Sequence, residues 1–479
     1  MSFSLSSLAF VSLVFALFYL IRRRARAYFL LLASLFFIAS LNPASCIWAV
    51  IVTGAVYFLG LVENRFLEKN NIIGTRIVTG IGVFCCALAL FILKNVANLD
   101  LQDPVLSKLV IPLGFSYYIF QAIAYLVDIC KGRMKAEKNI LFFALYMCFF
   151  PKFISGPIEE PSALLSQIKK LNCVNLKGDN KLSIAFPTIL YGLFMKVVVA
   201  DRIAPYTSKL LSNPEGYGSL WLLAGMLMYS FQIYCDFAGY SSIAVGIAKM
   251  FGIDLTENFF APYFSENVGE FWHRWHVSLS RWLRNYIYIP LGGNRKGTVR
   301  KYINTMVVFL ICGMWHGAGL NFIIWGFLHG IFMIVFGILS KNRAKEISET
   351  KKSLAFPAGA VLTFILISFA WIFFGSADAG SAITFVGRML SFKAGDTALA
   401  AQSKALGINK MDVLIPIYAF VVFAFDLLMV KKNMPIGKAL YSLPDAARYA
   451  IEYLFIMAIM LFGIYGPSYH PESFMYMQF

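Results

Sequence analysis

Long blocks of apolar residues constrain this chain more than any other feature of its sequence. Examples are Leu5–Ile21, Ile77–Leu93 and Val413–Val430, which contain few charged side chains. An apolar block of about 20 residues is long enough to cross a bilayer as a helix. The chain is 59% hydrophobic and only 14% charged, whereas a soluble domain carries about 25% charged residues. The sequence therefore predicts an all-α, polytopic membrane protein.

The apolar blocks predict about 11–13 transmembrane or re-entrant helices. We expect them to form one integral-membrane domain over residues 1–479, with a polar outer loop near Gly375–Met411. The segment Leu145–Pro161 breaks at Pro151 and Pro157, and broken helices at membrane depth predict a cavity. The candidate spans are Leu5–Ile21, Tyr28–Leu41, Ser45–Val62, Ile72–Leu93, Leu106–Cys130, Asn139–Phe150, Ser183–Ala200, Leu220–Met250, Tyr302–Trp315, Asn321–Ser340, Leu354–Phe374, Val413–Val430 and Tyr449–Tyr465.

The net charge of +17 is distributed over short loops between the apolar blocks. Basic loops of membrane proteins stay in the cytoplasm, so we expect the N-terminus outside. A charge spread loop by loop disfavours a nucleic-acid partner and is compatible with contacts to lipid headgroups. The basic loops are Arg22–Arg26, Lys131–Lys138, Arg281–Lys301, Lys341–Lys352 and Lys431–Lys432.

The segment Phe271–Pro290 is unusually polar and aromatic for this chain. Given a helical period, it predicts an amphipathic helix in the membrane interface. On that helix His276 points into protein or membrane, and His273 points towards water or headgroups. The alternative is a simple anchor whose arginines hold lipid phosphates. The apolar face would carry Trp272, Trp275, Leu279, Trp282, Leu283 and Tyr286, and the polar face Arg274, Ser278, Arg281 and Asn285.

A second candidate histidine, His316, follows a fully apolar run and has three glycines as near neighbours. An ionisable residue at membrane depth is a functional candidate by default, and glycines permit a broken helix or the close approach of a ligand. A structural histidine inside a helix bundle is an equal alternative here, and it is the favoured interpretation for His329. The two histidines of the H-x-x-H pair His273 and His276 lack a third ligand nearby, so no metal site is expected.

A third polar group lies in an otherwise apolar stretch. Gln232, Asp236 and Tyr240 recur every fourth residue and therefore share one helix face. A buried carboxylate needs a partner, and we expect an arginine of Phe271–Arg300 to supply it. Structural pairing is the favoured role of Asp236, and shaping a reaction cavity is the alternative.

These stretches resemble the membrane-bound O-acyltransferase family, and closely its bacterial alginate O-acetyltransferase branch. The resemblance implies a ring of membrane helices around a central funnel, with the reactive centre at its bottom. It assigns the family's central histidine to the W-H-G motif at His316 and its second histidine to R-W-H-x-S-L-S at His276. The resembling runs are Ile111–Ile129, Phe149–Ile158, Gln232–Gly246, Asn258–Arg295, Cys312–Gly330 and Phe474–Phe479.

The resemblance also implies the chemistry, which is transfer of an acyl group from a cytoplasmic thioester to a hydroxyl. A neutral imidazole suits proton removal near neutral pH. We therefore expect His316 to act as the general base, or briefly as the acyl carrier, and His276 to orient it or to polarise the carbonyl. The other expected substrate-binding residues are Gln232, Asp236, Trp272, Arg274, Ser278, Arg281, Asn285, Asn294, Arg295 and Trp315.

We expect acetyl-CoA as the acyl donor and no permanently bound cofactor. The basic loop Gly292–Lys301 would meet the phosphates of coenzyme A, although simple positive-inside topology explains this loop equally well. The expected protein relays acetyl across a bacterial plasma membrane to an exported or cell-wall polysaccharide, with a separate periplasmic or cell-surface acetyltransferase as partner. One alternative is D-alanyl transfer from a carrier-protein thioester to teichoic acid. Another is a polysaccharide or ion transporter without covalent chemistry.

Overall fold

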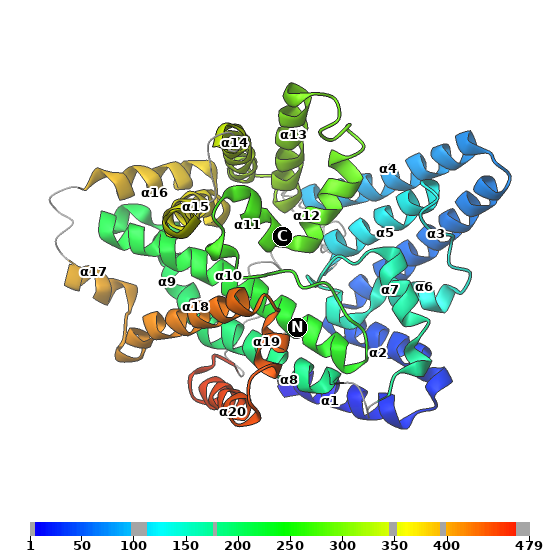
Figure 1. The fold of residues 1–479 in the computed structure, drawn as a ribbon, viewed down its shortest axis with the longest axis horizontal. Helices are drawn as coiled ribbons and strands as arrows, with labels where there is room; N and C mark the ends of the chain where they lie inside the picture. The colour runs from blue at the N-terminus through cyan, green and yellow to red at the C-terminus, as the bar shows by residue number, and fades with distance from the viewer. Residues whose placement is uncertain (1–4, 97–112, 176–179, 344–351, 393–398, 466–479) are drawn as a thin grey trace. The chain divides into compact units, whose positions relative to one another are not determined.

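The computed structural model describes residues 5–96, 113–175, 180–343, 352–392 and 399–465 (Figure 1). Helices make up most of these residues, and none of the described residues forms a β-strand. The all-α prediction is therefore confirmed. The start of the predicted span Leu106–Cys130 and the whole run Phe474–Phe479 lie outside the described residues.

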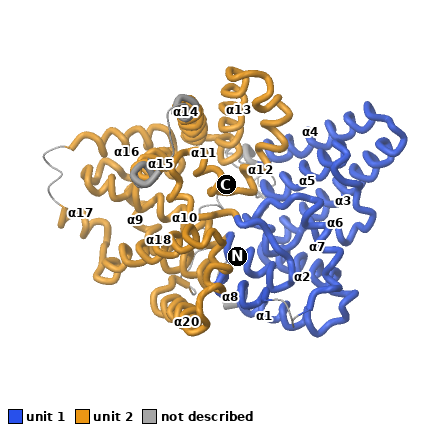
Figure 2. Tube along the Cα trace, viewed as in Figure 1, with its two compact units in different colours: residues 1–189, 241–257, 466–471 blue, residues 190–240, 258–465, 472–479 orange. Residues whose placement is uncertain are grey.

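The described chain divides into two compact units (Figure 2). Unit 1 comprises the described residues of 1–189 and 241–257, and unit 2 those of 190–240 and 258–465. The prediction of a single domain stays a prediction. The helices of unit 1 are α1 (Leu5–Leu20), α2 (Arg26–Leu41), α3 (Pro43–Glu68), α4 (Ile72–Val96), α5 (Phe115–Cys130), α6 (Ile140–Cys148) and α7 (Pro161–Ile168).

Two helices contribute to both units, namely α8 (Lys181–Leu193) and the long α10 (Ser219–Met250). Unit 2 also contains two π-helical segments, η4 (Phe194–Ala200) and η7 (Arg284–Tyr288). Its α-helices are α9 (Asp201–Ser212), α11 (Val268–Arg274), α12 (Val277–Leu283), α13 (Thr298–His316), α14 (Leu320–Arg343), α15 (Lys352–Gly375), α16 (Ala379–Ser391), α17 (Leu399–Leu406), α18 (Ile415–Lys432), α19 (Ile436–Tyr441) and α20 (Asp445–Phe462).

Eight helical stretches among the described residues are long and apolar enough to cross a membrane. Three shorter apolar helices accompany them. The predicted spans Tyr302–Trp315 and Tyr449–Tyr465 also form helices, α13 and α20, but they fall outside the group of eight. The eight are Arg23–Leu41, Pro43–Glu68, Ile72–Leu93, Lys181–Ser212, Ser219–Met250, Leu320–Leu339, Ala358–Gly375 and Lys410–Lys432.

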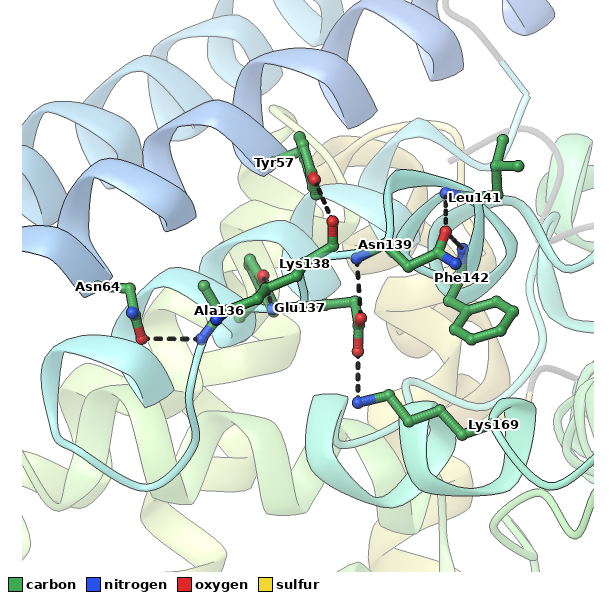
Figure 3. A network of polar contacts seen from close by, with 10 residues as sticks. Tyr57, Asn64, Ala136, Glu137, Lys138, Asn139, Leu141, Phe142 and Lys169 are labelled. Carbon is green, nitrogen blue, oxygen red and sulfur yellow. Dashed lines mark hydrogen bonds and ion pairs between the residues drawn. The ribbon is translucent and has the colours of Figure 1, made fainter.

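In unit 1, α3, α4 and α5 pack against one another, and polar contacts hold the basic loop Lys131–Lys138 against the helices (Figure 3). The backbone N–H of Ala136 donates to Oδ1 of Asn64 on α3 at 3.2 Å. The carboxylate of Glu137 lies 2.6 Å from Nζ of Lys169, which follows α7. The loop is therefore fixed by one side chain from α3 and by one from the residue that follows α7.

The predicted break in Leu145–Pro161 is present. The α-helix α6 ends at Cys148, a short 3-10 helix (η2) covers Phe150–Lys152, and the next α-helix begins at Pro161. Lys152, the last residue of η2, is buried and donates from Nζ to Oε1 of Gln121 on α5 at 2.6 Å. The amide oxygen gives the buried cation a polar partner, as a buried charge requires. The cavity expected beside this break stays a prediction.

The region Gly375–Met411, for which the sequence predicts a polar outer loop, lies between two stretches able to cross a membrane but is largely helical where the structure describes it. Its place outside the membrane stays a prediction. The described part of this region contains two helices, α16 and α17. In α16 the buried residues Ala382, Phe385 and Met389 recur at helical spacing, so an amphipathic helix forms here. The polar residues between them had hidden this period in the sequence.

Candidate active site

The predicted single helix over Phe271–Pro290 is interrupted at its second histidine. Helix α11 ends at Arg274, α12 begins at Val277, and His276 between them has a φ of 43°. That value lies in the left-handed region of the backbone, which L-residues with a Cβ atom rarely adopt. The prediction of a continuous helix was therefore wrong.

The backbone at this break is held by a neighbouring segment. The N–H of Val277 donates to the backbone oxygen of Asn258 at 3.1 Å, and the N–H of Ser278 donates to Oδ1 of Asn258 at 3.0 Å. The N–H of Phe260 donates to the oxygen of Arg274 at 3.0 Å. These bonds satisfy groups that a helix break would otherwise leave unpaired. Sequence reasoning missed Asn258, which stands first in the run Asn258–Arg295.

The side chain of His276 is 1% exposed, whereas His273 is exposed. The predicted difference in burial between these histidines is thus confirmed. The imidazole of His276 meets the ring of Phe237 on α10 at 4.7 Å and an interplanar angle of 88°. Burial lowers the pKa of His276 to about 3, so the ring is neutral at physiological pH.

The other candidate, His316, is the last residue of α13 and lies where α13 packs closely against α14. A Cβ atom at Gly313 would lie 2.4 Å from the backbone oxygen of Phe322, and one at Gly326 would lie 2.4 Å from that of Phe309. Only glycine fits at such distances, and small residues let membrane helices approach each other. The glycine pair therefore brings the end of α13 against α14.

The His316 side chain is 3% exposed and surrounded by aromatic rings. Its ring centroid lies 4.6 Å from Trp315, 5.1 Å from Trp325 on α14 and 5.0 Å from Phe374 on α15. The polypeptide continues through Gly317 in an extended conformation. His316 thus sits at a helix end, in an apolar surrounding built by three helices.

A chain of ring contacts within unit 2 connects His276 to His316. We call its four members the aromatic cluster: Phe259, Trp275, Trp371 and Trp325. Phe259 lies 6.5 Å from His276 and 5.0 Å from Trp275. Trp371 lies 5.0 Å from Trp275 and 5.7 Å from Trp325. Since Trp325 contacts His316, both imidazoles border the same cluster.

The partner of Asp236 differs from the prediction. Asp236 on α10 lies 2.5 Å from Nζ of Lys196, which comes from the π-helical segment η4, and not beside an arginine of Phe271–Arg300. The same Nζ lies 2.8 Å from Oδ1 of Asp201. Lys196 was missed because it stands alone inside an apolar run. Its isolation there was the available signal.

The remaining residues of the α10 face are also buried. Gln232 accepts a short hydrogen bond from the hydroxyl of Thr207 on α9, and Tyr240 is buried as well. Among the described residues, no group of three or more His, Cys, Asp or Glu side chains is arranged to hold a metal ion. The three residues of the predicted shared face are therefore all buried inside unit 2.

The predicted substrate-binding residues near His276 have several different surroundings. Arg274 pairs with Glu270 at 2.5 Å, and the indole N–H of Trp272 donates to Nδ1 of His329 at 3.2 Å. Ser278 is buried, so its placement on a polar face was wrong, because the break at His276 changes the phase of the helix. The half-buried members of the set are Arg281 and Asn285.

Farther along, Asn294 and Arg295 are exposed in the turn between η7 and α13. The buried amide of Asn304 holds this turn by donating to the backbone oxygen of Gly293 at 2.9 Å. Gly293 has a positive φ of 55°. The turn therefore exposes basic side chains, and a hydrogen bond from α13 holds its backbone.

The sequence profile of the membrane-bound O-acyltransferase family matches residues 106–377. A probable alginate O-acetylase of Pseudomonas putida is 33% identical over 427 residues, which cover 87% of this chain and 84% of that protein. A peptidoglycan O-acetyltransferase of Helicobacter pylori is 38% identical over 299 residues, covering 57% and 56% of the two chains. A teichoic acid D-alanyltransferase of Bacillus subtilis is 28% identical over 270 residues, covering 55% and 67%.

The profile match includes both candidate histidines, and the Pseudomonas relative is similar over most of the chain. Together with eight helices able to cross a membrane, these matches make the chain a multi-pass membrane enzyme. It belongs to the membrane-bound O-acyltransferase family and is an O-acyltransferase.

Proposed function

We propose that this enzyme transfers acetyl from acetyl-CoA, taken from the cytoplasmic side of a bacterial plasma membrane, towards an exported or cell-wall polysaccharide. The acetyl group is supported by the relative named as a probable alginate O-acetylase, which is 33% identical and covers 87% of this chain. The relative named as a peptidoglycan O-acetyltransferase supports a glycan polymer in the cell envelope. Alginate and peptidoglycan are both glycan polymers, so we propose a glycan polymer as the final acceptor without naming which one.

One observation carries the mechanism: two buried imidazoles, His276 and His316, border the same aromatic cluster. In the proposed reaction His316 takes the proton from the acceptor hydroxyl. The hydroxyl oxygen attacks the thioester carbonyl, and the carbon–sulfur bond breaks. The thiolate of coenzyme A then takes the proton from His316 and leaves as the thiol. His276, held neutral, orients His316 or polarises the carbonyl oxygen.

A second route keeps the same residues but forms two successive bonds. Here a nitrogen of His316 attacks the thioester carbonyl, the carbon–sulfur bond breaks, and coenzyme A leaves as the thiol with the proton that the imidazole loses. The acceptor oxygen then attacks the acyl-histidine, the carbon–nitrogen bond breaks, and the hydroxyl proton returns to the imidazole. Both routes need an unprotonated imidazole at the start. They differ in whether labelled acetyl remains on the protein when the acceptor is withheld.

The basic segment Gly292–Lys301, which includes the turn and the first residues of α13, suits the donor end of this reaction. Arg295, Lys296 and Arg300 are exposed, and guanidinium and ammonium groups pair well with phosphates. Replacing these three residues by glutamine should raise the KM for acetyl-CoA and weaken its dependence on salt, because exposed charges are screened by salt. An unchanged KM would leave the segment with a topological role alone.

The transfer onto the polymer itself would be completed by a separate periplasmic or cell-surface acetyltransferase. The sequence contains no G-D-S motif of the kind that exported acetyltransferases carry, which supports a division of labour between two polypeptides. The membrane enzyme would then hand acetyl to its partner, with membrane lipid as its surrounding and no bound cofactor.

The D-alanyl alternative rests on the Bacillus subtilis relative, whose identity of 28% covers 55% of this chain. The acetylating relatives are more similar, so we rank the D-alanyl reaction second. The transporter alternative loses its support, because the chain belongs to an acyltransferase family.

A direct test uses membranes that contain the wild type or His316→Ala and acetyl-CoA labelled in the acetyl group. We expect the wild type to release free coenzyme A and the variant to lose this activity. A fully active variant would remove His316 from the mechanism. If the wild type consumes only a D-alanyl carrier-protein thioester, the second function replaces the first.

A further inference from the structure

His329 on α14 is a buried histidine that the proposed mechanism does not use. Its side chain is 0% exposed, and its Nδ1 accepts the indole N–H of Trp272 at 3.2 Å. An indole nitrogen only donates, so Nδ1 of His329 carries a lone pair. The imidazole is therefore neutral and bears its proton on Nε2.

The surroundings of His329 keep this ring in one orientation. The rings of Phe271 and Phe309 lie nearly parallel to it, at 6.4 and 6.1 Å and at interplanar angles of 17°. In the described part of the chain Nε2 has no nitrogen or oxygen partner, and the rings of Trp325 and Trp371 lie 4.8 and 6.1 Å from the imidazole. The bond from Trp272 is the strong polar contact of this imidazole.

His329 touches both halves of the candidate active site. Trp272 stands in α11, the helix that leads into His276. Trp325 lies 4.8 Å from His329 and 5.1 Å from His316, at interplanar angles of 63° and 87°. One indole therefore separates the structural histidine from the proposed general base, and another binds the structural histidine to α11, the helix that precedes His276.

We propose that His329 is a positioning residue for acyl transfer, and that its hydrogen bond from Trp272 holds α11 and Trp325 so that His276 and His316 act on one substrate. The inference rests on the proposed function, because it gives His329 a role in the same reaction. It assigns the Nε2-protonated imidazole a task that an apolar ring of equal size does not perform.

Four variants test this role. Trp272→Phe removes the donor and keeps a ring, and His329→Phe removes the acceptor and keeps a ring. Each should lower kcat about tenfold, the order expected for one buried hydrogen bond, with little change in the KM for the thioester. The double variant should be no slower than either single variant, because both remove the same bond. His329→Gln, whose amide oxygen accepts, should recover part of the lost rate.

Trp48→Phe on α3 serves as the matched control and should keep wild-type activity. A merely structural role predicts instead that the variants lower the thermal midpoint while the rate per folded molecule is unchanged. Additive losses in the double variant, or a fully active His329→Phe, would overturn the proposal.

A spectroscopic readout separates this inference from the proposed function. In protein with ¹⁵N-labelled histidine, one imidazole should show an unprotonated Nδ1 and a protonated Nε2, and this signal should vanish in His329→Phe. It should shift in Trp272→Phe. An Nδ1-protonated or doubly protonated His329 would refute the inference whatever the donor is. If the wild type does not consume acetyl-CoA, the proposed acetyl transfer is wrong. The rates of the Trp272 and His329 variants are then measured with the carrier-protein thioester.

Discussion

The Nζ atom of Lys196 lies 2.5 Å from Oδ1 of Asp236, and both side chains are withdrawn from solvent, with exposures of 1% and 3%. The same ammonium group also pairs with Asp201. One cation from η4 therefore serves two carboxylates, and it ties α10 to the helix that runs through η4 into α9.

The first prediction concerns this buried cation. Lys196→Met leaves two buried carboxylates without their counter-charge, and breaking a buried pair in this way costs about 3–5 kcal/mol. The thermal midpoint of Lys196→Met in detergent should fall strongly, and the midpoint of Lys196→Arg should fall less. Lys432→Met, at an exposed position, is the matched control and should leave the midpoint unchanged. Equal midpoints for the two methionine variants would show that the buried ion pairs of Lys196 do not stabilise the fold.

The second prediction follows from the positive φ of His276. A left-handed conformation costs residues with a Cβ about 1–2 kcal/mol, and glycine avoids this cost. His276→Gly should therefore be at least as stable as His276→Ala, although both should be inactive. At the exposed helical position His273 the order should reverse, with glycine the less stable, and both variants should remain active. Thermal midpoints of the four proteins measure this difference.

The third prediction is the pH dependence of stability. Burial lowers the pKa of His276 to about 3 in the folded protein, while the unfolded chain binds this proton near pH 6.5. Between these values the unfolded state holds more protons, so stability is lost as the pH falls. The loss from this residue amounts to about 1.4 kcal/mol per pH unit.

The check is a comparison of wild type with His276→Gly over pH 7 to 4. The wild type should lose stability more steeply than the variant as the medium becomes acidic, and the two slopes should coincide above about pH 7. Parallel curves throughout the acidic range would mean that His276 is protonated as easily in the fold as outside it.

The fourth prediction addresses the contact between α13 and α14. Gly313→Ala places a methyl group against the backbone of α14 and should cost about 1–3 kcal/mol, as overpacking does. Because His316 ends the same helix, we also expect a lower kcat in purified, folded enzyme. Gly387→Ala on α16, where a Cβ meets nothing within 4 Å, should keep kcat and should be no less stable than the wild type, because alanine favours a helix over glycine. A stable and fully active Gly313→Ala would show that the helices can separate without consequence.

Much of the fold could be predicted because apolar blocks of bilayer length report local structure directly. The burial of His276 was also predicted correctly, although the helix assumed for it is broken. The prediction succeeded because Trp275 and Leu279, on either side of the break, remain buried. In α16 the polar residues between the buried ones hid the helical period, so the sequence predicted a loop where a helix forms.

The parts of the site that could not be predicted depend on distant segments. Lys196 pairs with Asp236 on a different helix, α10, and no local period in the sequence predicts this pair. Asn258 accepts a backbone N–H at the break beside His276 from outside the helix. The bond between Trp272 and His329 likewise joins α11 to α14. Such contacts are decided by packing, so one sequence alone does not specify them.

The π-helical segment η4 has a consequence for how this lineage can change. At its end the N–H of Asp201, the first residue of α9, donates to the backbone oxygen of Lys196, which is a step of five residues instead of four. Deleting a single residue there would restore ordinary helical spacing and would turn Lys196 away from one of its two carboxylates. Orthologues should therefore tolerate substitution in 194–200 far better than any change in its length.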